Sequence, residues 1–125
     1  MGSSRLVDDY VLLRPSDLVD PEELIALVCE AGALLRGMST PRLLVDSRHM
    51  TGTPNPLEGA RIVSTAADEI DKSARIAFLF ADSGKQSLSQ PVLFGLKMLG
   101  YDIGGFFDED RAHAWLREKP ADPDR

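Results

Sequence analysis

An apolar run at residues 75–81 (RIAFLFA) constrains the fold of this chain more than any other stretch. It is too short for an amphipathic helix and lacks the alternation of a strand with one face in water. A continuous run of this length is typical of a strand covered by helices on both faces, as in parallel sheets. Residues 82–85 (DSGK) end the run with turn-forming residues. We therefore expect a central β-strand here.

Residues 42–46 (RLLVD) form a second apolar run, which ends at Asp46. The two runs are about thirty residues apart, the length of a β-strand, crossover helix and parallel β-strand unit. Asn55, Pro56 and Glu58 lie between them and have the pattern of a capped helix start, so a crossover helix is expected there. The two strands should therefore be parallel neighbours, and the segments 47–54 and 82–90 should leave the sheet at the same edge.

Two shorter strands are expected near the start of the chain, at residues 5–7 and 10–14, joined in a hairpin by Asp8 and Asp9. The first would be an edge strand, to which a second subunit could add. Another short strand is expected at residues 103–107.

Three further helices are predicted from capping residues. Asp20 is expected to cap the first, with Glu23 completing a capping box. Ser87 or Ser89 is expected to cap the third, which has a proline in its first turn, and Asp108 the last.

The length of 125 residues suits one domain, which we place at residues 1–119, with a polar tail at 120–125. The net charge of −6 repels phosphate backbones, so nucleic acid is not an expected partner. No apolar run reaches the roughly 20 residues of a membrane span, and the first residues do not resemble a signal peptide. A cytoplasmic location is expected.

Residues 105–116 (GFFDEDRAHAWL) resemble the F-x-D-x-x-x-A-x-x-W-L close of the bacterial SpoIIAA-like family. Residues 43–46 and 74–77 are similar to two strands of that family, which is related in fold to anti-sigma-factor antagonists (STAS domains) and CRAL-TRIO lipid carriers. The resemblance implies one α/β domain with a mixed sheet of about four or five strands and about four helices. It also implies a homodimer without enzymatic activity.

In regulatory STAS proteins a partner kinase phosphorylates a serine in the turn before a helix. The corresponding stretch here, residues 50–54, contains no serine, so the resemblance places that role on Thr51 or Thr53. Both are expected at or just ahead of a helix N-terminus, where free N–H groups favour a phosphate.

The edge at which the two central strands end is where open α/β sheets bind ligands. Two solvated loops of ordinary turn composition are the alternative interpretation of the same residues. The candidate binding or regulatory residues at this edge are Asp46, Arg48, Thr51, Thr53, Asp82, Ser83, Lys85 and Ser87.

The sequence contains no catalytic or cofactor motif, and no metal or cofactor is expected. The favoured hypothesis is a regulatory or protein-interaction module with an unidentified protein partner. One alternative is a carrier of a small apolar molecule or lipid between helix and sheet, in a cavity lined by Phe78, Phe80, Phe94 and Leu96. A weaker alternative is an enzyme that uses Asp46 or Asp82 as a base in a deep pocket.

Overall fold

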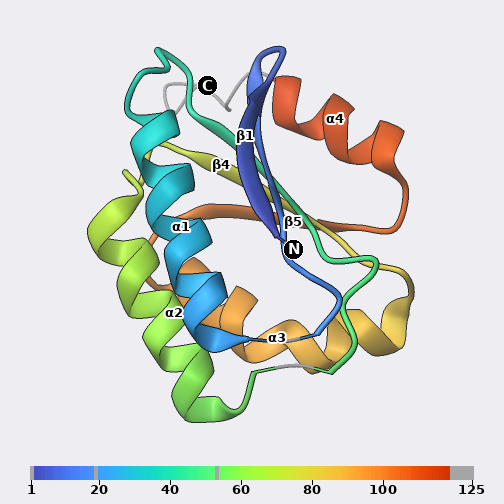
Figure 1. The fold of residues 1–125 in the computed structure, drawn as a ribbon. Helices are drawn as coiled ribbons and strands as arrows, with labels where there is room; N and C mark the ends of the chain where they lie inside the picture. The colour runs from blue at the N-terminus through green and yellow to red at the C-terminus, as the bar shows by residue number, and fades with distance from the viewer. Residues whose placement is uncertain (1, 19, 53, 119–125) are drawn as a thin grey trace.

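The computed structural model describes residues 2–18, 20–52 and 54–118, which form one α/β unit (Figure 1). Five strands make a mixed sheet in chain order: β1 (Ser3–Val7), β2 (Tyr10–Arg14), β3 (Arg42–Asp46), β4 (Arg75–Leu79) and β5 (Asp102–Phe106). The helices are α1 (Pro21–Leu35), α2 (Pro56–Glu69), α3 (Ser83–Met98) and α4 (Glu109–Arg117). The predicted α/β architecture with a mixed sheet of four or five strands is confirmed, and the sheet has five. The expected tail at 120–125 lies outside the described residues.

Strands β1 and β2 form the predicted antiparallel hairpin, and all other neighbours in the sheet are parallel. Asp8 has a φ of 52° in the tight connection between the two strands. Aspartate tolerates this left-handed conformation better than most residues, because its short polar side chain can bond locally. The turn expected from Asp8 and Asp9 is therefore present.

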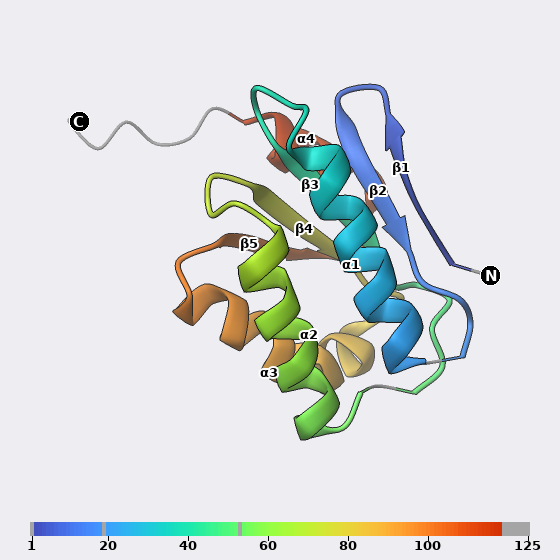
Figure 2. The ribbon, with the colours of Figure 1, turned by 60° about the vertical axis from the view of Figure 1, so that its left-hand side comes forward.

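Helices cover both faces of the sheet, as the unbroken apolar run in β4 indicated. On one face, α1, α2 and α3 enclose a core that includes Val28, Ile76 and Leu93; on the other, α4 packs through Ala112 and Leu116 (Figures 1 and 2). Burial of both apolar surfaces is the main stabilising contribution to such a layered fold. Within the described residues, no helix is both long and apolar enough to cross a bilayer.

Two predicted helix starts differ in their capping. At α2, Asn55 Oδ1 accepts from the Glu58 N–H at 2.8 Å and Glu58 Oε1 accepts from the Asn55 N–H at 2.9 Å, which is the predicted capping box. At α1, Asp20 is the N-cap, but the capping box is absent. Instead, Glu23 Oε1 accepts from the Ser16 N–H at 3.0 Å and ties the preceding segment to the helix.

The predicted start of α3 at Ser87 or Ser89 is wrong. The helix begins at Ser83, shortly after β4 ends at Leu79, and Asp82 is its N-cap, so Pro91 lies inside the helix. A proline there removes one backbone hydrogen bond. Residues 82–90, which were expected to form a loop, therefore make up the N-cap and first turns of a helix.

Candidate functional site

The carboxyl ends of β3 and β4 lie side by side, as the sequence predicted. The two strands are parallel and paired from Arg42 with Arg75 to Asp46 with Leu79. Beyond the last pair, the Ser47 N–H donates to the Leu79 carbonyl at 2.9 Å. The segments after both strands therefore leave from one edge of the sheet, which we call the carboxyl edge.

Asp46 lies at the carboxyl edge between two arginines and is only 2% exposed. Arg48 donates to it twice, from Nε to Oδ1 at 3.0 Å and from Nη2 to Oδ2 at 2.9 Å. Arg14, at the end of β2, donates from Nη2 to Oδ2 at 3.2 Å. Arg48 also lies 3.9 Å from Glu109 of α4. The Asp46 carboxylate thus connects the end of β2, the end of β3 and the loop that follows β3.

Burial acts to raise the pKa of Asp46, but the hydrogen bonds from Arg48 and the positive charges of Arg48 and Arg14 outweigh it. The pKa of Asp46 is therefore held below its ordinary value, and the group is a carboxylate at neutral pH. In the same way, the hydrogen bonds to Asp46 raise the pKa of Arg48 above its ordinary value. A carboxylate in this state is suited to holding structure and is a weak base.

The ion pairs at Asp46 determine how the loop after β3 begins. Besides the two side-chain bonds, the backbone N–H of Arg48 donates to Asp46 Oδ1 at 3.2 Å. Both the main chain and the side chain of Arg48 are thus fixed on the carboxylate. Because the Arg48 guanidinium is ion-paired with Asp46, it has less capacity to bind a separate anion.

Thr51 is exposed and is anchored to the segment that precedes α1. Its N–H and its hydroxyl both donate to the Asp17 carbonyl, at 2.7 and 2.9 Å. An isolated parallel bridge between Leu18 and Thr51 continues this contact. The loop is therefore tied to the chain between β2 and α1. Thr53 lies outside the described residues.

The start of α2 is less suited to a phosphate than the sequence suggested. Thr51 lies four residues ahead of the N-cap Asn55, so it is not at the helix terminus itself. The capping box already binds two of the free N–H groups, and Pro56 has none. Glu58 places a negative charge in the first turn, which would repel a second anion.

The remaining polar candidates lie at the start of α3. Asp82 Oδ1 accepts from the Lys85 N–H at 2.9 Å, which caps the helix. Ser83 follows Asp82 at the first helical position and is exposed. Lys85 and Ser87 lie further along the helix. The structure thus brings Asp82 and Ser83 to the carboxyl edge, where Asp46 and Arg48 also lie.

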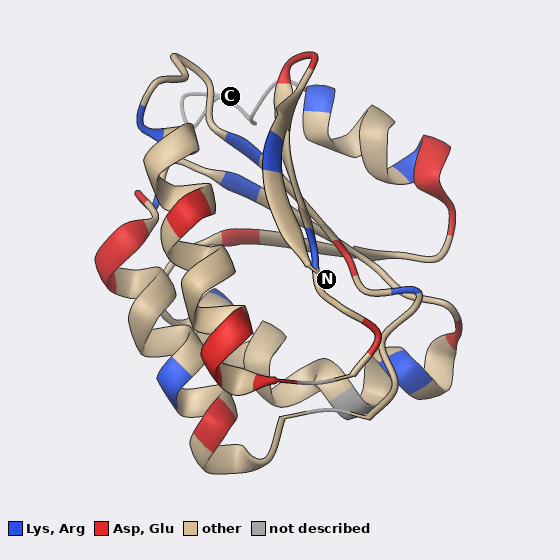
Figure 3. Cartoon of the chain, viewed as in Figure 1, with Lys and Arg blue, Asp and Glu red and all other residues tan. Residues whose placement is uncertain are grey.

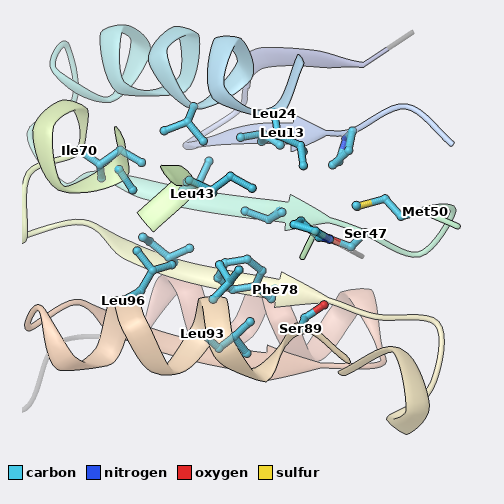
Figure 4. A pocket seen from close by; sticks show the side chains of 18 of the residues that line it. Leu13, Leu24, Leu43, Ser47, Met50, Ile70, Phe78, Ser89, Leu93 and Leu96 are labelled. Carbon is cyan, nitrogen blue, oxygen red and sulfur yellow. The ribbon is translucent and has the colours of Figure 1, made fainter. Parts of the chain in front are cut away.

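An apolar cavity of about 100 Å³ lies on the face of the sheet that α1, α2 and α3 cover (Figure 4). Phe78, Phe80 and Leu96 are among the residues that line it, while its polar lining residues are Ser47 and Ser89. A cavity of about 150 Å³ in another protein accepts benzene, so this one admits a molecule of a few heavy atoms and not a fatty-acyl chain.

The expectation that Phe94 lines an apolar cavity is wrong. Its side chain is 63% exposed on α3. Phe94 follows the buried Leu93, and successive residues on a helix are about 100° apart, so the two cannot share the inward face.

Neither aspartate proposed as a base lies in this cavity. Its described lining contains no carboxylate. Asp46 is ion-paired on the α4 side of the sheet, and Asp82 is an exposed helix cap. Among the described residues, no group of three or more histidine, cysteine or acidic side chains could hold a metal ion.

Arg14 is part of the Asp46 cluster but was not among the sequence candidates. Residues 11–14 end in arginine and residues 42–46 end in aspartate, and the two strands are parallel neighbours with Leu13 opposite Val45. The last residues of such strands meet on one face of the sheet. Two apolar runs that end in residues of opposite charge were thus the sequence feature that could have predicted the contact between Arg14 and Asp46.

Comparison with known proteins finds similarity at the level of the fold. No family model matches the sequence, and a search of curated proteins gives no match. Among solved structures, an anti-sigma factor antagonist from Mycobacterium paratuberculosis is similar with a TM-score of 0.63 and 17% identity over 94% of both chains. An anti-sigma-factor antagonist (STAS) domain protein from Planctomyces limnophilus is similar with a TM-score of 0.61 and 7% identity, over 94% of this chain and 98% of that chain.

The chain therefore has the SpoIIAA-like STAS fold, as the resemblance at residues 105–116 implied.

Proposed function

We propose that this chain is a non-catalytic regulatory module that binds a partner protein, in the manner of an anti-sigma-factor antagonist. The observation that carries the proposal is the structural similarity to two such antagonists over 94% of the chain. By the names of those neighbours, the partner would be an anti-sigma factor. A cytoplasmic location is part of the proposal.

We place the docking surface at the carboxyl edge, around the loop at residues 47–54 and the start of α3. Three contacts support this choice, because they hold exposed or half-buried residues of the edge in defined positions. Arg48 donates hydrogen bonds to Asp46, and the Thr51 hydroxyl donates to the Asp17 carbonyl. Asp82 caps the first turn of α3. A surface ordered before binding loses less conformational entropy on association.

Phosphorylation of Thr51 or Thr53 would be the regulatory step. Thr51 is exposed, so a kinase could reach it, but its hydroxyl donates to the Asp17 carbonyl at 2.9 Å. A phosphate on that oxygen would remove the donor and add about two negative charges beside the Asp17 carbonyl. We therefore expect the modification to release the loop from the segment before α1 and so to weaken docking.

The docking surface is tested by titrating the purified chain, in a calorimeter, with each anti-sigma factor encoded in its host's genome. We expect at least one to bind the unmodified chain. Ser83→Tyr adds a bulky side chain at the carboxyl edge and should weaken binding at least about tenfold. Ser73→Tyr is the matched control, because Ser73 is also exposed but precedes β4, at the opposite edge.

Failure of every anti-sigma factor to bind would contradict the proposed partner, and equal weakening by both tyrosine variants would contradict the proposed edge. For the regulatory step, the chain is incubated with the binding anti-sigma factor and ATP, and the peptide with residues 47–54 is analysed by mass spectrometry. Phosphate on this peptide is the expected result, and phosphate on another segment alone would contradict it.

A further inference from the structure

A groove of about 720 Å³ runs between α2 and α3, from Pro54 and Asn55 next to the carboxyl edge as far as Leu99. Its floor and sides are formed mainly by small or apolar residues, among them Gly59, Ala60 and Val63 of α2 and Pro91, Gly95 and Leu99 of α3. The helices approach closely at Gly95, and Gly59 leaves space for an ordinary contact. A Cβ on Gly95 would lie 3.1 Å from Val63 Cγ2, and one on Gly59 would lie 3.4 Å from Val92 Cγ2.

Large apolar side chains next to this groove are exposed to solvent. Phe94 and Met98 are 63% and 71% exposed. They are four residues apart on α3, so they lie on one side of the helix, next to the groove residues Pro91 and Gly95. Leu57 at the start of α2 is 74% exposed. One patch of surface thus contains both a depression and projecting side chains that could fill such a depression.

The charges of the two helices are unusual for this chain. The whole sequence has 14 basic and 20 acidic residues, yet all the groove-lining residues are uncharged. Helix α2 has Glu58, Asp68 and Glu69 against Arg61, whereas α3 has Lys85 and Lys97 and no acidic residue. Together the helices are neutral, with negative charge on α2 and positive charge on α3 (Figure 3).

We propose that a second copy of this chain occupies the groove, in a two-fold symmetric dimer that places α3 of each copy against α2 of the other. A two-fold interface needs a surface that is complementary to itself, and this patch has both the groove and the residues to fill it. The acidic α2 of one copy would face the basic α3 of the other. Two chains of charge −6 are repelled least where neither presents net charge.

The composition of the patch agrees with an interface between protein copies. Interface centres are depleted in charged residues and enriched in aromatic residues and methionine. The edge strand β1, where Leu6 is 55% exposed, is the competing dimer surface. It carries Arg5 in the middle of the strand, and pairing of two such strands about that residue would oppose like charges.

Sedimentation equilibrium of the purified chain between about 1 and 300 µM tests the proposal, a range that spans weak protein association. We expect a reversible dimer. Phe94→Asp and, separately, Met98→Asp should each raise the dissociation constant at least about tenfold. Leu18→Asp is the matched control, because Leu18 is 75% exposed but lies before α1. Leu6→Asp tests the β1 edge and should leave the dimer intact.

Hydrogen exchange of the unmodified chain gives a second measurement that depends on no variant. Amides of α2 and α3 should gain protection as the concentration rises, while those of β1 should not. A monomer at all concentrations, a dimer that resists both aspartate substitutions on α3, or loss of the dimer in Leu6→Asp would overturn the proposal. The docking surface at the carboxyl edge adjoins the groove at Pro54 but is tested separately, by the binding of anti-sigma factors to the Ser83→Tyr and Ser73→Tyr variants.

Discussion

The Arg75 guanidinium lies 4.6 Å from the centre of the Trp115 ring, and its Nη1 donates to the Trp115 carbonyl at 2.6 Å. Arg42, its partner in the neighbouring strand, donates from Nε to the Leu116 carbonyl at 2.9 Å. The last carbonyls of a helix lack partners within it and carry partial negative charge. Two arginines at the amino ends of β3 and β4 therefore fix the C-terminal end of α4 on the sheet.

Arg75→Lys should destabilise the chain by about 1–3 kcal/mol, because an ammonium group cannot stack on the ring and bond several carbonyls at once. Trp115 is the single tryptophan, so its fluorescence during urea unfolding reports on α4 directly. Arg111→Lys is the control, since the Arg111 side chain is 83% exposed. Equal midpoints for the two variants would show that Arg75 does not hold α4.

Asp46→Asn should lower the free energy of unfolding by about 1–3 kcal/mol at neutral pH, because it removes the charge that pairs with Arg48 and Arg14. The pKa of Asp46 is lowered in the folded state, so the stabilisation is present above its unfolded value of about 3.9 and is lost as pH falls through the folded value. The difference between the two chains should therefore shrink below about pH 4.

Urea unfolding at a series of pH values measures this difference. Asp17→Asn is a suitable control, because Asp17 is exposed. A difference that stays constant down to pH 2 would argue that the cost arises from packing and not from the charge.

Asp82→Ala should lower stability by about 0.5–2 kcal/mol, the usual cost of losing a helix N-cap. Ser87→Ala should change it by less than about 0.5 kcal/mol, since Ser87 is exposed within the helix. Thermal unfolding followed by circular dichroism compares the two. The reverse order of effects would place the helix start where the sequence first suggested.

Gly32→Ala should destabilise the chain by about 1–3 kcal/mol through overpacking between α1 and α2. A Cβ on Gly32 would lie 2.5 Å from the Glu69 carbonyl oxygen, which is backbone and cannot move freely. Gly37→Ala is the matched control, because the nearest atom to its Cβ, the Leu34 carbonyl oxygen, would lie 3.6 Å away. It should be neutral or stabilise by up to about 1 kcal/mol.

Urea midpoints of the two alanine variants decide between these expectations. If both variants lose the same stability, close helix packing at Gly32 is not the cause of the loss.

Local patterns were enough to predict the sheet and most helix starts. The apolar runs at β3 and β4 predict covered strands, because a strand that helices bury on both faces has an unbroken run of hydrophobic residues. Asp20, Asn55 and Asp108 cap helices where predicted, because capping depends on residues close in the chain. Parallel pairing of β3 with β4 followed from the spacing alone.

The start of α3 could not be predicted in the same way. Pro91 and the serines before it have the pattern of a helix start, and residues 82–85 have that of a turn. The structure shows one helix through both, with Asp82 as its cap. Pro91 removes the bond that would reach the Ser87 carbonyl, but both residues are exposed, so water can satisfy that oxygen.

Apart from the start of α3, the sequence by itself determined which segments are strands and helices, because these depend on neighbours a few residues apart. It also determined that the two central strands end at one edge, because the spacing between them fits a crossover helix. Only the tertiary structure decided that Arg14 meets Asp46, 32 residues away, and that Phe94 faces solvent instead of a cavity. Those outcomes depend on strand register and on the rotation of a helix about its axis, which are set by packing between elements distant in the chain.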